Sequence, residues 1–144
     1  MNTNYIVYGL NNRIASVVNI KNSNDFFNSI NISEGLRNSI FQRISVNKDF
    51  ELTLSELQQL IPALSEKINN LISDPDFNPF KEREREMYPM AYNNFPFMWN
   101  GVTYYLYPKA NDIDSEIRRV YGYLKLIQEH INQNKPLKYI YKNN

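Results

Sequence analysis

The sequence has no cysteine, one histidine and only four glycines among its 144 residues. Without cysteine, the chain has no disulfide bond, no thiolate zinc ligand and no cysteine nucleophile, and we expect a cytoplasmic protein. The glycines, Gly9, Gly35, Gly101 and Gly122, lie far apart. A glycine-rich loop that cradles a phosphate group is therefore excluded.

The single histidine, His130, limits the hydrolytic chemistry that we expect. A Ser-His-Asp triad would need His130 as its base, and the G-x-S-x-G motif that accompanies such triads is missing. We expect His130 to lie on the surface near the end of a helix, where a cation is favoured. These shortages predict a protein that is not an enzyme and that uses neither a metal nor another cofactor.

Neither sign of charge is concentrated. Sixteen basic and fifteen acidic residues give a net charge of +1, whereas nucleic-acid binders usually present a dense basic face. No stretch approaches the ~20 consecutive apolar residues that span a bilayer, and the first residues lack the pattern of a secretion signal. We therefore expect neither a nucleic-acid partner nor a membrane partner.

The length and the apolar fraction of 42% predict one domain over residues 1–144 with its own core. Residues 73–94 form a long, irregular and charged connection, and such connections are usually functional or mobile. Its basic residues Lys81, Arg83 and Arg85 form either a solvated surface or a segment that docks on a partner.

Two short runs near the start, residues 5–10 and 13–20, are apolar and separated by Asn11-Asn12. Asparagine tolerates the left-handed backbone of tight turns, so these runs predict a β-hairpin. With a two-residue loop, one face carries Tyr5, Val7, Ile14, Val18 and Ile20, and the other carries Ile6, Tyr8, Leu10 and Val17.

Two helix starts can be recognised from their capping residues. Ser33 is a candidate N-cap, and Thr53-x-x-Glu56 has the form of a capping box. The helix that follows Thr53 has a long apolar stripe, but Pro62 predicts a kink or break near residues 58–61.

The longest apolar seam runs from Ile113 to Ile131 with alternating four- and three-residue spacing, which is typical of a buried helix. Acidic residues at its start, Asp112, Asp114 and Glu116, complement the helix dipole. The alternating residues 137–142 predict a final strand.

The densest aromatic stretch is FPFMWNGVTYYLYP, residues 95–108. Its central Asn100-Gly101 is the strongest short-range signal for a hairpin. A two-residue turn sets Trp99 opposite Val102 and Phe97 opposite Tyr104. We expect this face of the hairpin to pack in the core.

The opposite face of the same hairpin is a candidate binding surface. It carries Met98, Tyr105 and Tyr107, and a sheet with helices on one side would leave it uncovered. Aromatic rings can also stack on a nucleotide, with Arg118 or Arg119 from the following helix contacting its phosphates. The face therefore predicts a protein partner or, alternatively, a nucleotide.

The string Asn100–Tyr105 followed by Asn111–Asp114 resembles a stretch of the small anti-CRISPR proteins of phages. The resemblance covers a short part of the chain, and the strong acidity of that family is missing here. No function and no residue role is carried over from it.

Together these patterns predict an α+β fold: a largely antiparallel sheet of about five to six strands, with two long amphipathic helices packed on one face. For function they favour a non-enzymatic interaction protein that binds a protein partner and can form homo-oligomers. The best concrete version is a small inhibitor from a phage or mobile element that binds a host defence protein or, as an immunity protein, a toxin. The alternative is a protein that sequesters a nucleotide.

Overall fold

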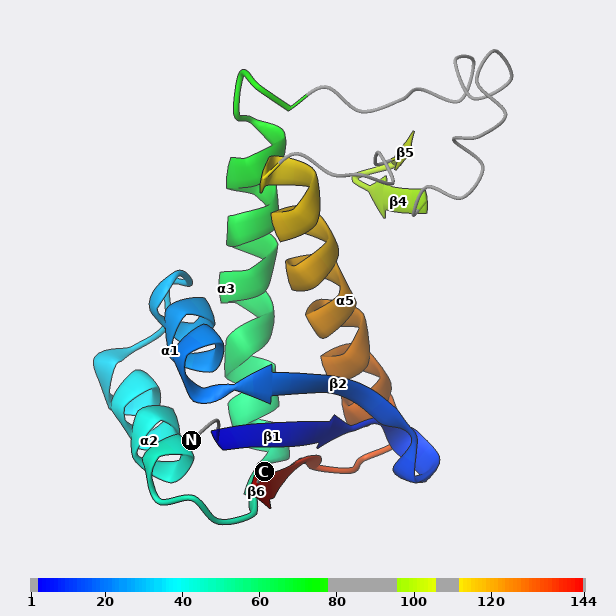
Figure 1. Cartoon of the computed structure of the whole chain (residues 1–144). Coiled ribbons are helices and arrows are strands. Elements are labelled where there is room, and N and C mark those ends of the chain that lie inside the picture. Colours follow the sequence, from blue (N-terminus) through cyan, green and yellow to red (C-terminus); the bar gives the residue numbers. More distant parts are fainter. Residues whose placement is uncertain (1–2, 78–95, 106–111, 144) are drawn as a thin grey trace. The chain divides into compact units, whose positions relative to one another are not determined.

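The computed structural model describes residues 3–77, 96–105 and 112–143. These residues form an α+β fold (Figure 1), which confirms the predicted class. The helices are α1 (Ile20–Asn28), α2 (Glu34–Ser45), α3 (Leu54–Ile72) and α5 (Asp112–Asn132), with a short 3-10 turn at Leu10–Asn12. The strands are β1 (Thr3–Tyr8), β2 (Ile14–Asn19), β3 (Phe50–Leu52), β4 (Pro96–Trp99), β5 (Val102–Tyr105) and β6 (Leu137–Asn143).

The chain groups into two compact units. Met1–Lys67 and Tyr123–Asn144 form unit 1, and Ile68–Gly122 forms unit 2. The prediction of a single domain over residues 1–144 stays a prediction. Most of the charged connection 73–94 lies outside the described residues.

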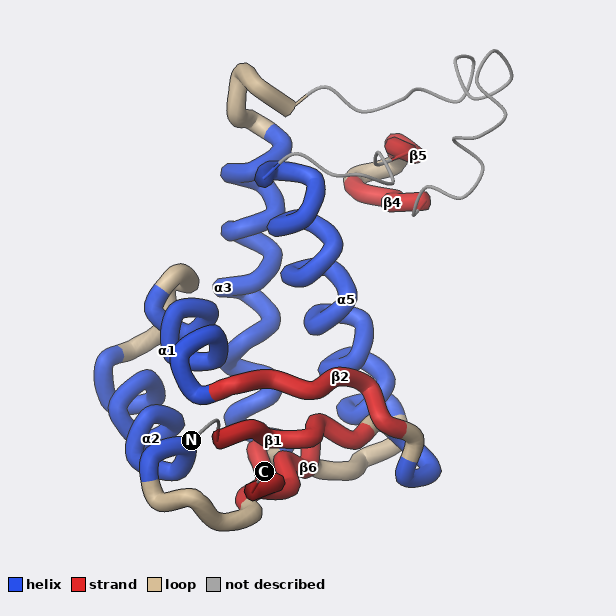
Figure 2. Tube along the Cα trace, viewed as in Figure 1, coloured by secondary structure: helices blue, strands red, loops and turns tan. Residues whose placement is uncertain are grey.

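Unit 1 contains a four-stranded antiparallel sheet in the order β2-β1-β6-β3. Figure 2 labels three of these strands, β2, β1 and β6. The first and last strands of the chain, β1 and β6, pair at the centre of this sheet. The other two strands, β4 and β5, form a separate two-stranded sheet in unit 2. The six described strands are thus divided between two sheets.

The turn between β1 and β2 has the geometry that its two asparagines predict. Asn11 and Asn12 have φ values of 61° and 58°, and the Arg13 N–H donates to the Leu10 carbonyl at 3.4 Å. From Asn4 to Val7 the register is also as predicted, since Ile6 pairs with Val17.

Three residues of the predicted hairpin pattern differ from the structure: Leu10 lies in the 3-10 turn, Ile20 begins α1, and Ile14 lies on the other face of the sheet. A bulge near the turn makes Tyr8 pair with Ile14, and Ala15 becomes the extra residue. Because paired residues point to the same face, Ile14 lies on the face of Tyr8 and not on that of Tyr5. An extra residue of this kind leaves no mark in the alternation of apolar side chains.

The face of the sheet that contains Tyr5 is the inner face, and it is buried. Tyr5 is fully buried, and its hydroxyl donates to the carbonyl of Ile44 in α2 at 2.9 Å. The Tyr5 ring meets the rings of Phe50 and Tyr139 edge-on, at 5.3 and 6.3 Å. These contacts join three strands and one helix in a single core.

The link between α1 and α2 is held by one arginine. Ser33 caps α2 as predicted, because its hydroxyl accepts from the Leu36 N–H at 3.2 Å. The Arg37 guanidinium donates to three backbone carbonyls, those of Phe27, Ile30 and Ile32, at 3.3, 3.0 and 3.3 Å. Phe27 lies in the last turn of α1, and Ile30 and Ile32 follow its end, so Arg37 supplies donors to carbonyls around the end of this helix.

Helix α3 continues through Pro62, so the break that this proline predicts is absent. Pro62 and Gln58 are both exposed, and water can therefore reach the Gln58 carbonyl that loses its helical donor. A proline inside a helix costs about 3 kcal/mol, whereas each fully buried leucine contributes about 1.5–3 kcal/mol. Leu57, Leu60 and Leu64 are all fully buried and together outweigh the proline.

Helix α5 ends in a Schellman motif. Asn134 has a φ of 56°, its N–H donates to Ile131, and the N–H of Lys135 donates to His130, both at 3.0 Å. The left-handed asparagine stops the helix and turns the chain into β6.

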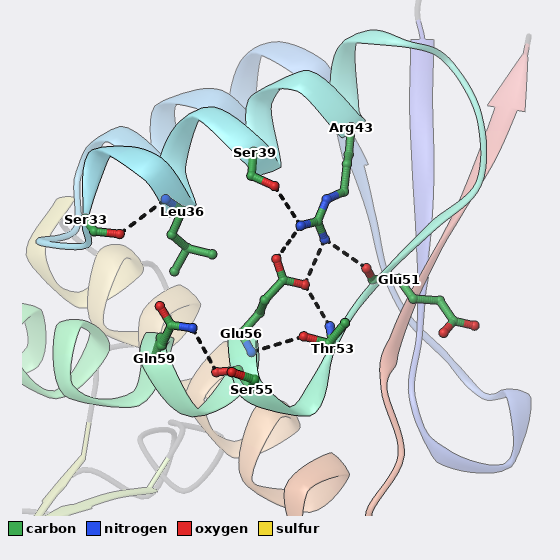
Figure 3. Close-up of polar contacts among 9 residues, drawn as sticks. All are labelled: Ser33, Leu36, Ser39, Arg43, Glu51, Thr53, Ser55, Glu56 and Gln59. Atoms are coloured by element: carbon green, nitrogen blue, oxygen red, sulfur yellow. Dashed lines mark hydrogen bonds and ion pairs between the residues drawn. The ribbon is translucent and has the colours of Figure 1, made fainter.

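An ion pair joins α2 to the start of α3 (Figure 3). The Arg43 guanidinium forms two hydrogen bonds with the Glu56 carboxylate, one of them 2.8 Å long, and it also contacts Ser39 and the Glu51 carbonyl. Glu56 also accepts from the Thr53 N–H at 2.9 Å, and the Thr53 hydroxyl accepts from the Glu56 N–H at 3.2 Å, which confirms the capping box. Burial alone would raise the pKa of Glu56, but the hydrogen bonds from Arg43 and Thr53 lower it overall.

Replacing this carboxylate gives a first prediction. Glu56→Gln should lower the free energy of unfolding at neutral pH by about 2 kcal/mol, because the charge-assisted bonds to Arg43 are lost. The folded pKa of Glu56 lies below its unfolded value, so its contribution is present above the unfolded pKa and disappears as the pH falls through the folded pKa. Urea unfolding at a series of pH values measures both effects.

The exposed Glu129 of α5 provides the control, since Glu129→Gln should change stability by less than about 0.5 kcal/mol. A Glu56→Gln protein as stable as the wild type at neutral pH would contradict the assignment. So would a stability difference that stays constant down to acid pH.

Candidate functional site

Unit 2 contains the aromatic hairpin that the sequence singles out. Asn100 and Gly101 have φ values of 51° and 79° and form the turn between β4 and β5. Trp99 pairs with Val102 and Phe97 with Tyr104, which confirms the predicted register. The hairpin therefore has two distinct faces.

The face of Phe97 packs inside unit 2, as predicted. Phe97 is fully buried, and its ring meets the Tyr121 ring of α5 edge-on at 4.9 Å. The Trp99 indole N–H donates to the Asn69 side-chain oxygen of α3 at 2.7 Å. Tyr104 contacts the Phe77 ring at 5.4 Å. This side of the hairpin therefore packs inside unit 2 around Phe97, while Val102 near the turn stays 47% exposed.

The opposite face carries Met98, whose side chain is 64% exposed. Tyr105 belongs to β5, but its side chain lies outside the described residues, as does the whole of Tyr107. The predicted binding surface is thus described only at Met98, and its aromatic part stays a prediction.

The arginines proposed to accompany this face lie in α5. The Arg119 guanidinium contacts both carboxylate oxygens of Glu116, at 2.6 and 2.9 Å. Arg118 is partly buried. Lys81, Arg83 and Arg85, the predicted docking residues, lie outside the described residues. The structure therefore does not bring the predicted site residues together into one described cluster.

The two faces of the hairpin give a second prediction. Phe97→Ala should destabilise the protein by about 3–5 kcal/mol and shift the emission of Trp99 to the red. Met98→Ala, on the other face, should change stability by less than about 0.5 kcal/mol. Trp99 is the only tryptophan of the chain, so chemical unfolding followed by its fluorescence reports on this region.

The assignment of the faces fails if the two alanine variants lose similar stability. The rings of Phe97 and Trp99 stack with their centroids 5.9 Å apart, so removal of the Phe97 ring should change the surroundings of Trp99. The assignment therefore also fails if Trp99 in folded Phe97→Ala has the same emission as in the wild type.

The single histidine differs from expectation. His130 is buried, so the prediction of a surface residue is wrong; its Nδ1 lies 3.1 Å from the Pro136 carbonyl and 3.3 Å from that of Lys135. A proton on Nδ1 makes the ring a donor that stabilises the chain after α5. Asp114 lies in the first turn of α5, as expected, and is fully buried. Among the described residues, no group of three or more acidic or histidine side chains is placed to hold a metal ion.

Two tyrosines share a short hydrogen bond inside unit 1. The hydroxyls of Tyr123 and Tyr139 lie 2.6 Å apart, next to the rings of Phe26 and Phe50. Burial raises the pKa of both hydroxyls above 10.0, the ordinary value for tyrosine. At neutral pH both groups are therefore protonated, and their contact is structural.

This pair gives a third prediction. Because the folded pKa values are raised, the neutral hydroxyls contribute fully below the unfolded pKa, and this contribution is lost as the pH rises above it. The free energy of unfolding of the wild type should begin to fall near pH 10, the ordinary pKa of tyrosine, and should continue to fall as the pH rises toward the raised folded pKa values. The fall should be smaller in the double variant Tyr123→Phe, Tyr139→Phe.

Tyr8→Phe, in which an outward-facing hydroxyl of the sheet is removed, is the control and should behave like the wild type. An equal pH slope for the double variant and the wild type would show that the buried pair does not carry the alkaline sensitivity.

The outer face of the four-stranded sheet carries a group of apolar side chains that the helices do not cover. Ile6 pairs with Val17 on one side and with Ile140 on the other, so the three side chains form a row across β2, β1 and β6. Tyr8 pairs with Ile14 on the same face. In Figure 1 the parts of α3 and α5 that belong to unit 1 pass behind β1 and β2.

We call these residues the outer sheet face: Ile6, Tyr8, Ile14, Val17 and Ile140. Ile14 is 56% exposed and Val17 57% exposed, and the other three are partly exposed. The alternation of side chains in the sequence places Ile140 and Tyr139 on opposite faces of a strand. It does not reveal that this strand, β6, lies beside β1. This face was therefore missed as a candidate site.

Comparisons with known proteins add no further assignment. No family model matches the chain, and neither a curated protein nor a solved structure shows significant similarity to it. In the part of the chain that the structure describes, no helix is both long enough and apolar enough to cross a membrane.

Proposed function

We propose that this protein acts by binding another protein through the outer sheet face. The observation that supports this proposal is the row Val17, Ile6 and Ile140, which is apolar, spans three strands and lies on the face opposite the helices. Exposed apolar residues that are contiguous on a surface are typical of interaction sites. Ile6 and Ile140 lie in the two central strands, β1 and β6, and such a preorganised surface lowers the entropic cost of binding.

The polar residues around this row indicate the chemistry of the partner. Lys138 and Lys142 are exposed and lie on the same face as Ile140, one on either side of it along β6. Asn4 and Asn19 extend the rim next to Lys142. At the other end of the row, the exposed Glu51 of β3 pairs with Lys138 on the same face and balances its charge, so the basic part of the rim is Lys142. An apolar centre with Lys142 and two amides at its rim complements a partner whose apolar patch has an acidic side chain beside it.

The narrower hypothesis, an inhibitor of a host defence protein or of a toxin, rests on the sequence alone and remains part of this proposal. Met98 on the hairpin of unit 2 is a second candidate contact. The nucleotide alternative gains no support from the described arginines, because the Arg119 guanidinium already contacts Glu116.

A site-specific crosslinking experiment tests the proposal. A photoreactive phenylalanine analogue replaces Ile140 on the outer sheet face or, as a control, Val46, which is 53% exposed and follows α2. Both variants are expressed in the native host and irradiated. The protein captured by the Ile140 probe and not by the Val46 probe is then purified for binding measurements.

In these measurements Ile140→Thr should weaken binding by about tenfold, because a buried apolar contact at the centre of an interface is truncated. Lys142→Glu should slow association and reduce its dependence on salt. Val46→Thr should bind like the wild type. Equal affinity for all variants would contradict the proposal, and so would capture of a foreign protein only by the Val46 probe. Thermal stabilisation by a nucleotide would favour the alternative.

A further inference from the structure

The two edges of the four-stranded sheet are protected to different degrees. The edge strand β3 has only three residues and carries Glu51, and both features discourage pairing with another strand. The other edge strand, β2, has six residues with the sequence IASVVN. It contains no charge and no proline, and three of its residues are β-branched. The features that natural proteins use to block an edge are therefore missing from β2, apart from the bulge at Ala15.

The exposure of β2 shows that its edge faces solvent. Ile14, Ala15, Ser16, Val17 and Asn19 are exposed, and Val18 is partly exposed. β2 pairs only with β1 among the described strands (Figure 2). A row of backbone N–H and C=O groups along its other side is thus open to a further strand. The bulge lies at the turn end and leaves the regular stretch Ser16–Asn19 intact.

We infer that this edge binds β2 of a second copy of the chain. The two strands pair in antiparallel orientation around a two-fold axis and join the two four-stranded sheets into one. Backbone hydrogen bonds supply the directional part of this contact, as in other cases of strand addition. A two-fold axis also satisfies both open edges at once, which gives a closed dimer and not a chain of copies.

The residues of β2 are compatible with this self-pairing. Residues that face each other across antiparallel strands must point to the same side of the sheet. Centring the axis on Val17 meets this condition, because Val17 faces Val17 of the second copy on the outer side and Ser16 faces Val18 on the inner side. Since β2 has no charged residue, no like charges oppose each other within the paired strands.

Such a dimer also enlarges the surface proposed to bind a partner. The outer sheet faces of the two copies lie side by side in the joined sheet, and the exposed Val17 side chains meet at its centre. The dimer does not depend on the proposed function, because it forms from the pure chain. The two proposals therefore fail separately.

Sedimentation equilibrium of the purified full chain tests the dimer. A single strand pair is at the small end of specific interfaces, so we expect a dissociation constant of about 10–100 µM. The apparent mass should rise from the monomer value of 17.1 kDa toward twice that value with concentration. Val17→Lys and Val17→Glu should each raise the dissociation constant at least about tenfold, because like charges then meet at the axis.

An equimolar mixture of the lysine and glutamate variants should restore the dimer, since opposite charges now face each other. Recovery of the dimer in this mixture would identify Val17 as the residue at which the two copies meet. The test works even if neither variant dimerises alone. Val46→Lys, an exposed valine outside the sheet, should dimerise like the wild type. Circular dichroism checks that each variant is folded.

Three results would overturn the inference. The first is a wild-type chain that stays monomeric over the whole concentration range. The second is a wild-type dimer that Val17→Lys does not weaken. The third is a mixture of the two charged variants that does not associate although the wild type does.

Discussion

The pairing of β1 with β6 is the interaction on which the rest of unit 1 depends. These strands come from opposite ends of the chain and match over six consecutive residue pairs, from Thr3 with Asn143 to Tyr8 with Lys138. Bringing the two ends of the chain together costs conformational entropy, and the burial of apolar side chains on the inner face of the sheet offsets this cost. The same pairing places Ile6 beside Ile140 on the outer side. One interaction therefore creates both the core and the candidate binding surface.

The side chains that look reactive in the sequence have structural roles in the fold. His130 lies against the carbonyls that follow α5, and Tyr123 and Tyr139 bond to each other inside the core. Arg43 and Glu56 hold α2 to the first turn of α3. By contrast, the apolar side chains of the outer sheet face have no comparable role in holding unit 1 together. This division of roles among the described residues is the reason why we propose a binding function for the outer sheet face.

Features that depend on neighbours in the sequence could be predicted from it. The asparagine turn, the register of the first hairpin, the capping box and the pairing around Asn100-Gly101 all follow from local propensities, and the structure confirms them. Features that depend on distant contacts could not be predicted. The bulge at Ala15, the burial of His130 and the separation of the strands into two sheets leave no periodic signal.

The candidate site shows the same limit. Met98 is exposed, which fits its predicted place on the outward face of the hairpin, because strand alternation alone decides it. The outer sheet face needed more information. Val17 and Ile140 each occupy outward positions in predicted strands, but only the strand order shows that both flank Ile6. A group of residues assembled from both ends of the chain is visible only once the topology is known.

Hydroxyl-radical footprinting of the free chain tests most directly whether the sheet has one covered and one open face. Ile6, Ile14, Val17 and Ile140 should be labelled readily, whereas Tyr5, Val7 and Tyr139 on the inner face should be protected. Equal protection on both faces would mean that the outer sheet face is already covered in the free chain. In that case it could not be the binding surface proposed for this protein.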